Sequence, residues 1–225
     1  MPRRLPAVLF DLDGTLIDSI ELILNSARYA FEGRTPAPDD AEWLSGVGTP
    51  LAEMFRLYAK DPADVEMLVE RYREYQLPNH DRLVRAYEGV VETVHGLRVA
   101  RHPLAVVTSK TESLARRGIE LVGIGSCFDV IIGCDSTTRH KPHPEPVLAA
   151  LERLGREPAE AVFVGDSVHD MAAGNAAGVA TIAALWGPFS REILAPSAPS
   201  HYLERIADLP ALLRPLNTGK TGTSA

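Results

Sequence analysis

Short, continuous apolar runs recur along the chain and constrain its fold more than any other feature. They cover residues 7–10, 104–107, 130–132, 161–164 and 180–183. Because they are continuous and not alternating, they indicate buried parallel strands that are covered on both faces. Helical patterns at about 111–122, 144–154 and 167–177 separate the last four runs. This alternation predicts an α/β fold with a doubly wound parallel sheet.

The stretch between the first two runs departs from this rhythm. It contains no convincing strand, and its apolar spacing is helical at about 19–32, 50–59, 62–77 and 89–100. An all-helical insertion is therefore predicted directly after the first strand. The expected organisation is a Rossmann-like core of residues 1–16 and 86–216, a helical insertion of residues 17–85, and a polar tail of residues 217–225 that we expect to be disordered.

The net charge and the cysteine content limit which binding partners and which cellular compartment we expect. The 225 residues carry a formal net charge of -7, which argues against nucleic acid or an anionic membrane as the main partner. A small anionic substrate stays compatible, because a metal ion and one or two lysines can reverse the local field. We find no signal peptide and no membrane-spanning run, so we expect a cytoplasmic protein. Two cysteines predict no disulfide framework, and the sequence leaves both monomer and homodimer open.

A pair of aspartates directly follows the first predicted strand, in the segment Asp11-Leu12-Asp13-Gly14-Thr15. In extended backbone, residues i and i+2 point to the same side, so Asp11 and Asp13 project together. The carboxyl ends of strands are also where open α/β sheets bind ligands. An ordinary Asp-Gly turn explains Asp13 but not the carboxylate two residues earlier. The segment therefore predicts two functional carboxylates.

Hydroxyl groups follow the second predicted strand, where Thr108 and Ser109 come directly after residues 104–107. A hydroxyl at this position, together with free backbone N–H groups before a helix, can bind an anion. Serine and threonine after a strand are also common helix N-caps. Taken alone, this segment is therefore a weak indication of an anion site.

A lysine and two histidines share the segment His140-Lys141-Pro142-His143-Pro144. A lysine held beside prolines is a positioned cation, and it can neutralise charge on a transferring phosphoryl group. An exposed loop lysine is the simpler interpretation of Lys141 taken by itself. The two histidines lack a third ligand at a suitable spacing for zinc, so we interpret them as loop residues.

A second pair of aspartates follows the strand at 161–164. Asp166 ends that strand region, and Asp170 lies four residues later on the same helix face. An N-capping aspartate would account for one of the two but not for both. Carboxylate oxygens at this density suit Mg²⁺ and not zinc.

All four segments are predicted at carboxyl ends of core strands, so one sheet would bring them to one crevice. In this order they resemble the motifs of the haloacid dehalogenase superfamily of phosphohydrolases. The matching residues are Asp11 to Thr15, Thr108, Lys141, and Gly165-Asp166 with Asp170. The resemblance covers nearly all of residues 5–213, and the helical insertion is similar to the helical cap of that superfamily.

The resemblance implies the catalytic roles. Asp11 is expected to attack phosphorus and form an aspartyl-phosphate, and Asp13 is expected to act as general acid and then as general base. Thr108 and the backbone N–H of Ser109 would bind phosphoryl oxygens. Lys141 would offset negative charge, contact the substrate and orient Asp11.

The resemblance also implies Mg²⁺ as the cofactor. The expected ligands are Asp11, the backbone carbonyl of Asp13, and Asp166. Asp170 would bind the ion through water or support the other ligands. The ion would screen the repulsion between an anionic nucleophile and an anionic phosphate.

Within the superfamily, the chain looks most similar to phosphoglycolate phosphatases and to bacterial pyrophosphatases. The loop at 48–51 and the pattern from Tyr75 to Val84 look more like the pyrophosphatase branch. By this resemblance, Gly48, Thr49 and His80 would contact the substrate. The expected substrate is a small phosphorylated metabolite resembling phosphoglycolate, or pyrophosphate.

Two alternatives stay open at this point. A phosphomutase resembling β-phosphoglucomutase shares the catalytic groups but must also hold a second phosphate, and the loop at 45–51 contains no Arg or Lys. The other alternative is a non-catalytic regulatory protein on the same scaffold, because a fold does not imply a function. All the expected catalytic groups are present, which favours an enzyme.

Overall fold

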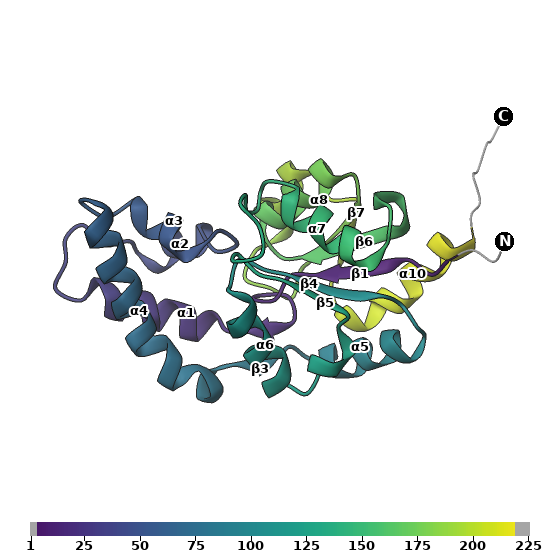
Figure 1. Ribbon diagram of the computed structural model, residues 1–225, viewed down its shortest axis with the longest axis horizontal. Helices are drawn as coiled ribbons and strands as arrows, with labels where there is room; N and C mark the ends of the chain where they lie inside the picture. Colours follow the sequence, from purple (N-terminus) through teal and green to yellow (C-terminus); the bar gives the residue numbers. More distant parts are fainter. Residues whose placement is uncertain (1–3, 219–225) are drawn as a thin grey trace.

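A six-stranded parallel sheet forms the centre of the molecule (Figure 1). The computed structural model describes residues 4–218, with side chains described through Arg214. The strand order is β5-β4-β1-β6-β7-β8, and every neighbouring pair is parallel. The strands are β1 (Ala7–Phe10), β4 (Leu104–Val107), β5 (Val130–Ile132), β6 (Ala161–Gly165), β7 (Ala180–Ala184) and β8 (His201–Leu203).

The five predicted strands are confirmed, and β8 was missed. β8 has three half-buried residues at the edge of the sheet, so it lacks the continuous apolar run that marks the central strands. In β1, alternate side chains enter two different hydrophobic clusters: Val8 and Phe10 on one face, Ala7 and Leu9 on the other. Burial on both faces is why this strand is apolar throughout.

Helices cover both faces of the sheet (Figure 1). On one face lie α5 (Val90–Val99), α6 (Glu112–Leu121) and α10 (Leu209–Thr218), and on the other lie α7 (Glu145–Leu154) and α8 (Val168–Ala177). All of these except α10 match predicted helices. The prediction of a doubly wound α/β sheet is therefore confirmed.

A helical insertion lies beside the sheet, at the left of Figure 1. It consists of α1 (Ile20–Phe31), α2 (Asp40–Ser45), α3 (Leu51–Arg56) and α4 (Pro62–Leu83). Its own aromatic cluster includes Phe31, Trp43 and Phe55, with ring centroids 4.9 to 5.7 Å apart. Two short antiparallel strands, β2 (Ile17–Asp18) and β3 (Arg85–Ala86), join the insertion to the core.

The helical prediction was incomplete within the insertion. It missed α2, β2 and β3, each of which has only two to six residues. It also ended α4 at residue 77, before Pro78, whereas the helix continues through Pro78 to Leu83. A proline removes one hydrogen bond from a helix interior, and here the helix continues past that position into a last turn that contains the buried His80.

The remaining elements lie in loops and near the C-terminus. They are α9 (Arg191–Leu194) and four 3₁₀ turns at Gly125–Cys127, Pro158–Glu160, Ala195–Ser197 and Ile206–Asp208. The predicted disordered tail began at residue 217, but residues 217 and 218 belong to α10. Residues 219–225 of that prediction lie outside the described residues.

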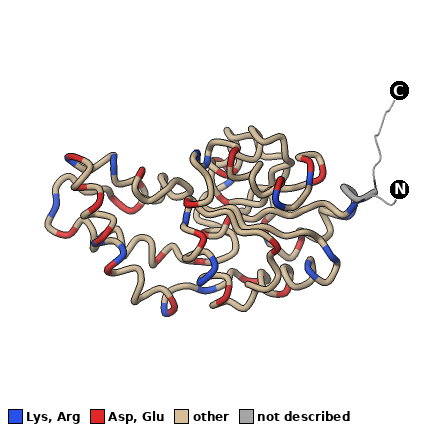
Figure 2. The backbone as a smooth tube through the Cα atoms, in the orientation of Figure 1, with Lys and Arg blue, Asp and Glu red and all other residues tan. Residues whose placement is uncertain are grey.

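The surface chemistry is mixed. Figure 2 shows Lys and Arg positions interspersed with Asp and Glu over both the core and the helical insertion. Within residues 4–218, no helix has the length and apolar character needed to cross a bilayer. Cys127 and Cys134 are both free thiols, as predicted.

Candidate active site

The strand order brings distant segments of the chain to one edge of the sheet. β4, β1 and β6 are neighbours, and Thr108, Asp11 and Asp166 directly follow them. The Asp11 N–H donates to the Val164 carbonyl, and the Thr108 N–H donates to the Ile132 carbonyl, both at 2.9 Å. These bonds continue the hydrogen-bonded ladder past the strand ends and fix the backbone at the site.

Three buried carboxylates gather there. Asp11, Asp166 and Asp170 are 4, 1 and 0% exposed, and each offers an oxygen within 4.8 Å of the others. The backbone of Gly14 approaches the carboxylate of Asp166 closely. Only glycine fits there, because a Cβ on Gly14 would lie 2.3 Å from Oδ2 of Asp166. Since buried like charges repel strongly, the cluster must either take up protons or hold a cation.

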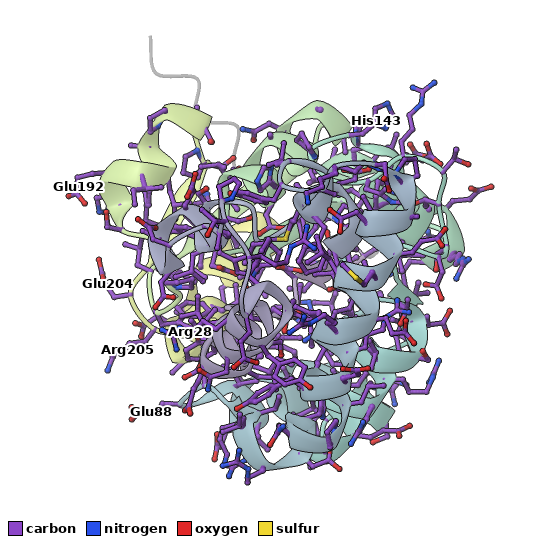
Figure 3. All side chains as sticks on the ribbon, turned by 90° about the vertical axis from the view of Figure 1, so that its left-hand side faces the viewer. Arg28, Glu88, His143, Glu192, Glu204 and Arg205 are labelled. Atoms are coloured by element: carbon purple, nitrogen blue, oxygen red, sulfur yellow. The ribbon has the colours of Figure 1, made fainter. Side chains whose placement is uncertain are left out.

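Lys141 supplies one buried positive charge. Its Nζ donates to Oδ1 of Asp11 at 2.8 Å and to Oδ1 of Asp170 at 2.6 Å, and its side chain is 2% exposed. The prediction that Lys141 lies beside Asp11 is confirmed, and the interpretation as an exposed loop lysine is wrong. His143 of the same segment lies at the periphery of the molecule, where its Nε2 contacts Arg139 (Figure 3).

Burial and mutual charge shift the pKa values of Asp11, Asp166 and Lys141. Burial, and then the charge of Asp170, raise the pKa of Asp11 to about 7, although Lys141 opposes this increase. Burial, followed by Asp170 and Asp11, likewise raises the pKa of Asp166. Burial alone would lower the pKa of Lys141, but Asp11 and Asp170 outweigh it and raise that pKa. One lysine therefore leaves the cluster short of positive charge.

The cluster fits Mg²⁺. Oδ2 of Asp166 is buried and has no hydrogen-bond partner among the described residues, whereas Oδ1 of Asp166 accepts from Thr15 at 2.6 Å. The ligand atoms that the cluster offers are all carboxylate oxygens, and Mg²⁺ prefers oxygen ligands. Oδ2 of Asp170 accepts from the N–H and the hydroxyl of Ser167, so its oxygens are already engaged within the protein. This favours a supporting role for Asp170, with Asp11 and Asp166 free to hold an ion.

We expect Mg²⁺ to raise the melting temperature much more at pH 8 than at pH 5. Between the ordinary carboxyl pKa of 3.8 and about 7, folded Asp11 binds more protons than it does in the unfolded chain. Without metal, its contribution to stability therefore falls as pH rises through that window. A divalent cation binds the ionised form, so its stabilisation grows over the same window.

Melting curves with Mg²⁺ or with EDTA, at pH 5, 6, 7 and 8, measure this effect. Asp166→Asn should remove most of the Mg²⁺-dependent increase. Asp40→Asn is the control, because Asp40 is an exposed residue of α2 that pairs with Arg28 and does not belong to the cluster, and it should keep the increase. An increase of equal size at pH 5 and pH 8 would contradict the raised pKa of Asp11.

Asp13 has different surroundings from Asp11. Oδ1 of Asp13 accepts from Ser19 and from Nζ of Lys110, the latter at 2.5 Å. Its carboxylate lies outside the three-carboxylate cluster, so only its backbone carbonyl stays a predicted metal ligand. Asp11 and Asp13 both line one cavity, so the two residues border the same space.

A cavity of about 190 Å³ lies between the sheet edge and the helical insertion. From the core it is lined by Asp11, Asp13, Thr108, Ser109 and Lys110. From the insertion it is lined by the loop that includes Gly48 and Thr49, by a face of α4, and by apolar side chains of α1 to α3. The cavity lining therefore includes four of the predicted substrate contacts, namely Thr108, Ser109, Gly48 and Thr49.

The loop at 46–49 contacts the core directly. The hydroxyl of Ser109 donates to the carbonyl of Gly48. Gly48 has φ +106, and a Cβ there would lie 2.9 Å from the Ser167 hydroxyl and 3.1 Å from the His169 ring. Only glycine combines this backbone conformation with so close an approach.

Gly48→Ala is therefore expected to lower kcat/KM roughly 10- to 100-fold by displacing this loop from the core. Gly33→Ala is a matched control in the same insertion, because Gly33 also has a positive φ, +75, but nothing within 4 Å of an added Cβ. Both variants should lose about 1–2 kcal/mol of stability from backbone strain, and only Gly48→Ala should lose activity. Equal activity in the two variants would show that contact between the loop and the core is unimportant.

His80 does not lie where it was predicted. Its ring is fully buried and is absent from the cavity lining, so the expected substrate contact is not formed. Nδ1 bonds to Oδ1 of Asp81 at 2.7 Å, and Arg117 of α6 contacts the same carboxylate oxygen at 3.0 Å. His80 instead packs at the junction between the end of α4 and the core.

Sequence reasoning missed several residues of the site. Lys110 directly follows Thr108 and Ser109, so the position that drew attention to those two residues was also a signal for Lys110. Arg73 and Gln76 line the cavity from α4, and they carried no local signal, because polar residues on an amphipathic helix usually face solvent.

Comparison with known proteins shows which family this chain resembles along its length. Residues 8–184 match the model of the haloacid dehalogenase-like hydrolase family. The chain is 39% identical over 208 residues to the pyrophosphatase PpaX of Bacillus velezensis, covering 92% of this chain and 95% of that protein. It is 38% identical over 207 residues to the pyrophosphatase PpaX of Bacillus pumilus, with coverage of 92% and 95%.

A solved structure of a predicted phosphoglycolate phosphatase from Haemophilus somnus is also similar. It has a TM-score of 0.81 and 25% identity, over 92% of this chain and 97% of that one. The family match spans most of the chain, and the relatives align along nearly their whole length. The chain therefore belongs to the haloacid dehalogenase-like hydrolases.

Proposed function

We propose that the protein is a Mg²⁺-dependent phosphohydrolase in which Asp11 is the covalent nucleophile. The observation that carries this proposal is the buried cluster of Asp11, Asp166 and Asp170, whose Asp166 Oδ2 lacks a partner among the described residues. Asp11 belongs to this cluster and also lines the cavity, so one carboxylate can face both a cation and a substrate. Bound Mg²⁺ would neutralise charge between the nucleophile and the phosphate.

The first step transfers the phosphoryl group to the protein. A carboxylate oxygen of Asp11 attacks phosphorus, and the bond from phosphorus to the leaving oxygen breaks. Asp13 donates a proton to that leaving oxygen. Thr108 and the N–H of Ser109 hold the non-bridging oxygens, and Lys141 keeps Asp11 oriented through its 2.8 Å contact.

The second step returns Asp11 to its starting state. Asp13 accepts a proton from a water molecule, whose oxygen attacks phosphorus and displaces the Asp11 carboxylate. The product is inorganic phosphate, and Asp13 is again protonated. The helical insertion, packed over the cavity through the contact between Ser109 and Gly48, would exclude other water during this sequence.

Pyrophosphate is the substrate that the relatives favour, because the two PpaX proteins are named pyrophosphatases. Phosphoglycolate is the second candidate, from the name of the structural neighbour. Both are small and carry two anionic groups, which suits a cavity of about 190 Å³.

A phosphate-release assay with Mg²⁺ tests this function. The protein should release phosphate from pyrophosphate or phosphoglycolate faster than from glucose 1-phosphate, and it should form no glucose 6-phosphate. Conversion of glucose 1-phosphate to glucose 6-phosphate with little free phosphate would identify a phosphomutase. Absence of both reactions across the panel would contradict an enzymatic role toward these substrates.

A further inference from the structure

One face of α4 lines the cavity opposite the catalytic carboxylates. Val69, Tyr72, Arg73 and Gln76 all contribute to the lining, and their spacing places them on one side of the helix. Arg73 and Gln76 are three residues apart, so their polar groups are neighbours on this face. The mechanism proposed above assigns neither of them a role.

Gln76 is a polar side chain without a protein partner. It is 4% exposed, and its amide forms no hydrogen bond to another described residue. Its amide atoms are not among the fully buried side-chain atoms that lack a partner, so they keep some accessible surface. Because the remaining accessible part of Gln76 faces the cavity, its amide is available to a ligand there.

Arg73 is a cation without a carboxylate partner, since it forms no ion pair within residues 4–218. Burial raises the pKa of Cys134, which lines the cavity from the core, and Arg73 is among the groups that oppose this increase. Arg73 is an exposed residue of α4 that also lines the cavity, so its guanidinium is free to contact a ligand there.

Lys110 supplies a second cation from the core. Its side chain is 10% exposed, and its Nζ lies 2.5 Å from Oδ1 of Asp13. An ammonium group has three N–H donors, of which Asp13 takes one. In the proposed mechanism Asp13 protonates the leaving oxygen, so Lys110 lies beside the leaving group.

We propose that Arg73, Gln76 and Lys110 form a subsite for a second anionic group, a phosphate or a carboxylate, carried by the leaving part of the substrate. This inference rests on the proposed function and specifies its substrate class. The rest of the cavity wall is largely apolar, with Trp43 and Met54 among its residues. Low polarity around the largely buried ammonium group of Lys110 strengthens its attraction for an anion.

The subsite explains how an acidic protein can select a doubly anionic substrate. The chain carries a formal net charge of -7, and three carboxylates cluster at the site. Arg73 and Lys110 are the cations among the described residues that line the cavity. Without them, the second anionic group would meet no positive charge among the lining residues, whereas with them it gains charge-assisted hydrogen bonds.

Calorimetry with two non-hydrolysable probes in excess Mg²⁺ tests the subsite. Methylenediphosphonate carries two anionic groups, and methylphosphonate carries one. Arg73→Met should weaken binding of methylenediphosphonate about 10- to 100-fold and reduce its preference over methylphosphonate by the same factor. Arg73→Lys should recover part of the loss, and Gln76→Leu should cause a smaller loss with the same selectivity.

Arg82→Met is the matched control, because Arg82 is an exposed residue of the same helix that does not line the cavity. It should leave the affinity for both probes unchanged. The subsite is wrong if Arg73→Met weakens both probes equally or neither, or if the unmodified protein does not prefer methylenediphosphonate.

The phosphate-release panel decides the proposed function independently of this measurement. Release from phosphomonoesters with no second anion, combined with no diphosphonate preference, would uphold the phosphohydrolase and overturn the subsite. Tight, Arg73-dependent binding of the diphosphonate without any turnover would uphold the subsite and overturn the phosphohydrolase.

Discussion

Asp11→Asn is expected to reduce phosphate release by about 10⁴-fold or more while leaving the protein folded. An amide oxygen is a poor nucleophile and cannot form the acyl phosphate, so the covalent route is lost. The fold should persist, because an asparagine keeps the shape of the side chain and still offers an oxygen to Lys141. It also removes one charge from a cluster that is short of cations.

Phosphate release and a thermal melt on the same preparation measure both parts of this expectation. The control is Asp40→Asn, which makes the same chemical change at an exposed ion pair with Arg28. Such surface pairs contribute little to stability, so this variant should retain full activity. Asp11→Asn with activity close to that of the unmodified protein would refute the assignment of Asp11 as nucleophile.

Lys141→Met is expected to lower the free energy of unfolding by about 3–5 kcal/mol at pH 8 in EDTA and to remove most activity. Lys141 bridges Asp11 and Asp170 with contacts of 2.8 and 2.6 Å, and its removal leaves three buried carboxylates without this cation. At pH 5 the loss should be smaller, because the raised pKa of Asp11 allows that group to take up a proton.

Urea unfolding at both pH values, with Mg²⁺ or EDTA, separates these contributions. Mg²⁺ should recover part of the lost stability, since it supplies positive charge to the same carboxylates, but it should not recover activity. Lys60→Met is the control, because Lys60 is exposed and its side chain forms no ion pair among the described residues. If Lys141→Met were as stable as Lys60→Met at pH 8 in EDTA, the charge balance described for the cluster would be wrong.

The core of the fold followed from local sequence because its strands are buried on both faces. The runs at 7–10, 104–107 and 161–164 became β1, β4 and β6, with boundaries within one residue. The two-residue strands β2 and β3 and the half-buried β8 escaped prediction. Their stability depends on pairing and on neighbouring elements, so their sequences carry little hydrophobic pattern.

In the candidate site, too, some residues were predictable from local sequence and others were not. Asp11, Thr108 and Asp166 were predictable because each directly follows a strand, and the carboxyl ends of parallel strands meet at one edge of a sheet. The buried environment of Lys141 was not predictable from its local sequence. Its loop position suggested exposure, but the charge of two buried carboxylates holds the ammonium inside the protein.

The sequence by itself therefore determined the order of the central strands along the chain, the helical insertion after the first strand, and the polar residues at the strand ends. Only the tertiary structure decided that Lys110 pairs with Asp13, 97 positions away, that His80 is buried, and that Arg73 and Gln76 face the cavity. The physical reason is that these outcomes depend on how the insertion packs against the core. That packing joins residues far apart in sequence, and no local periodicity encodes it.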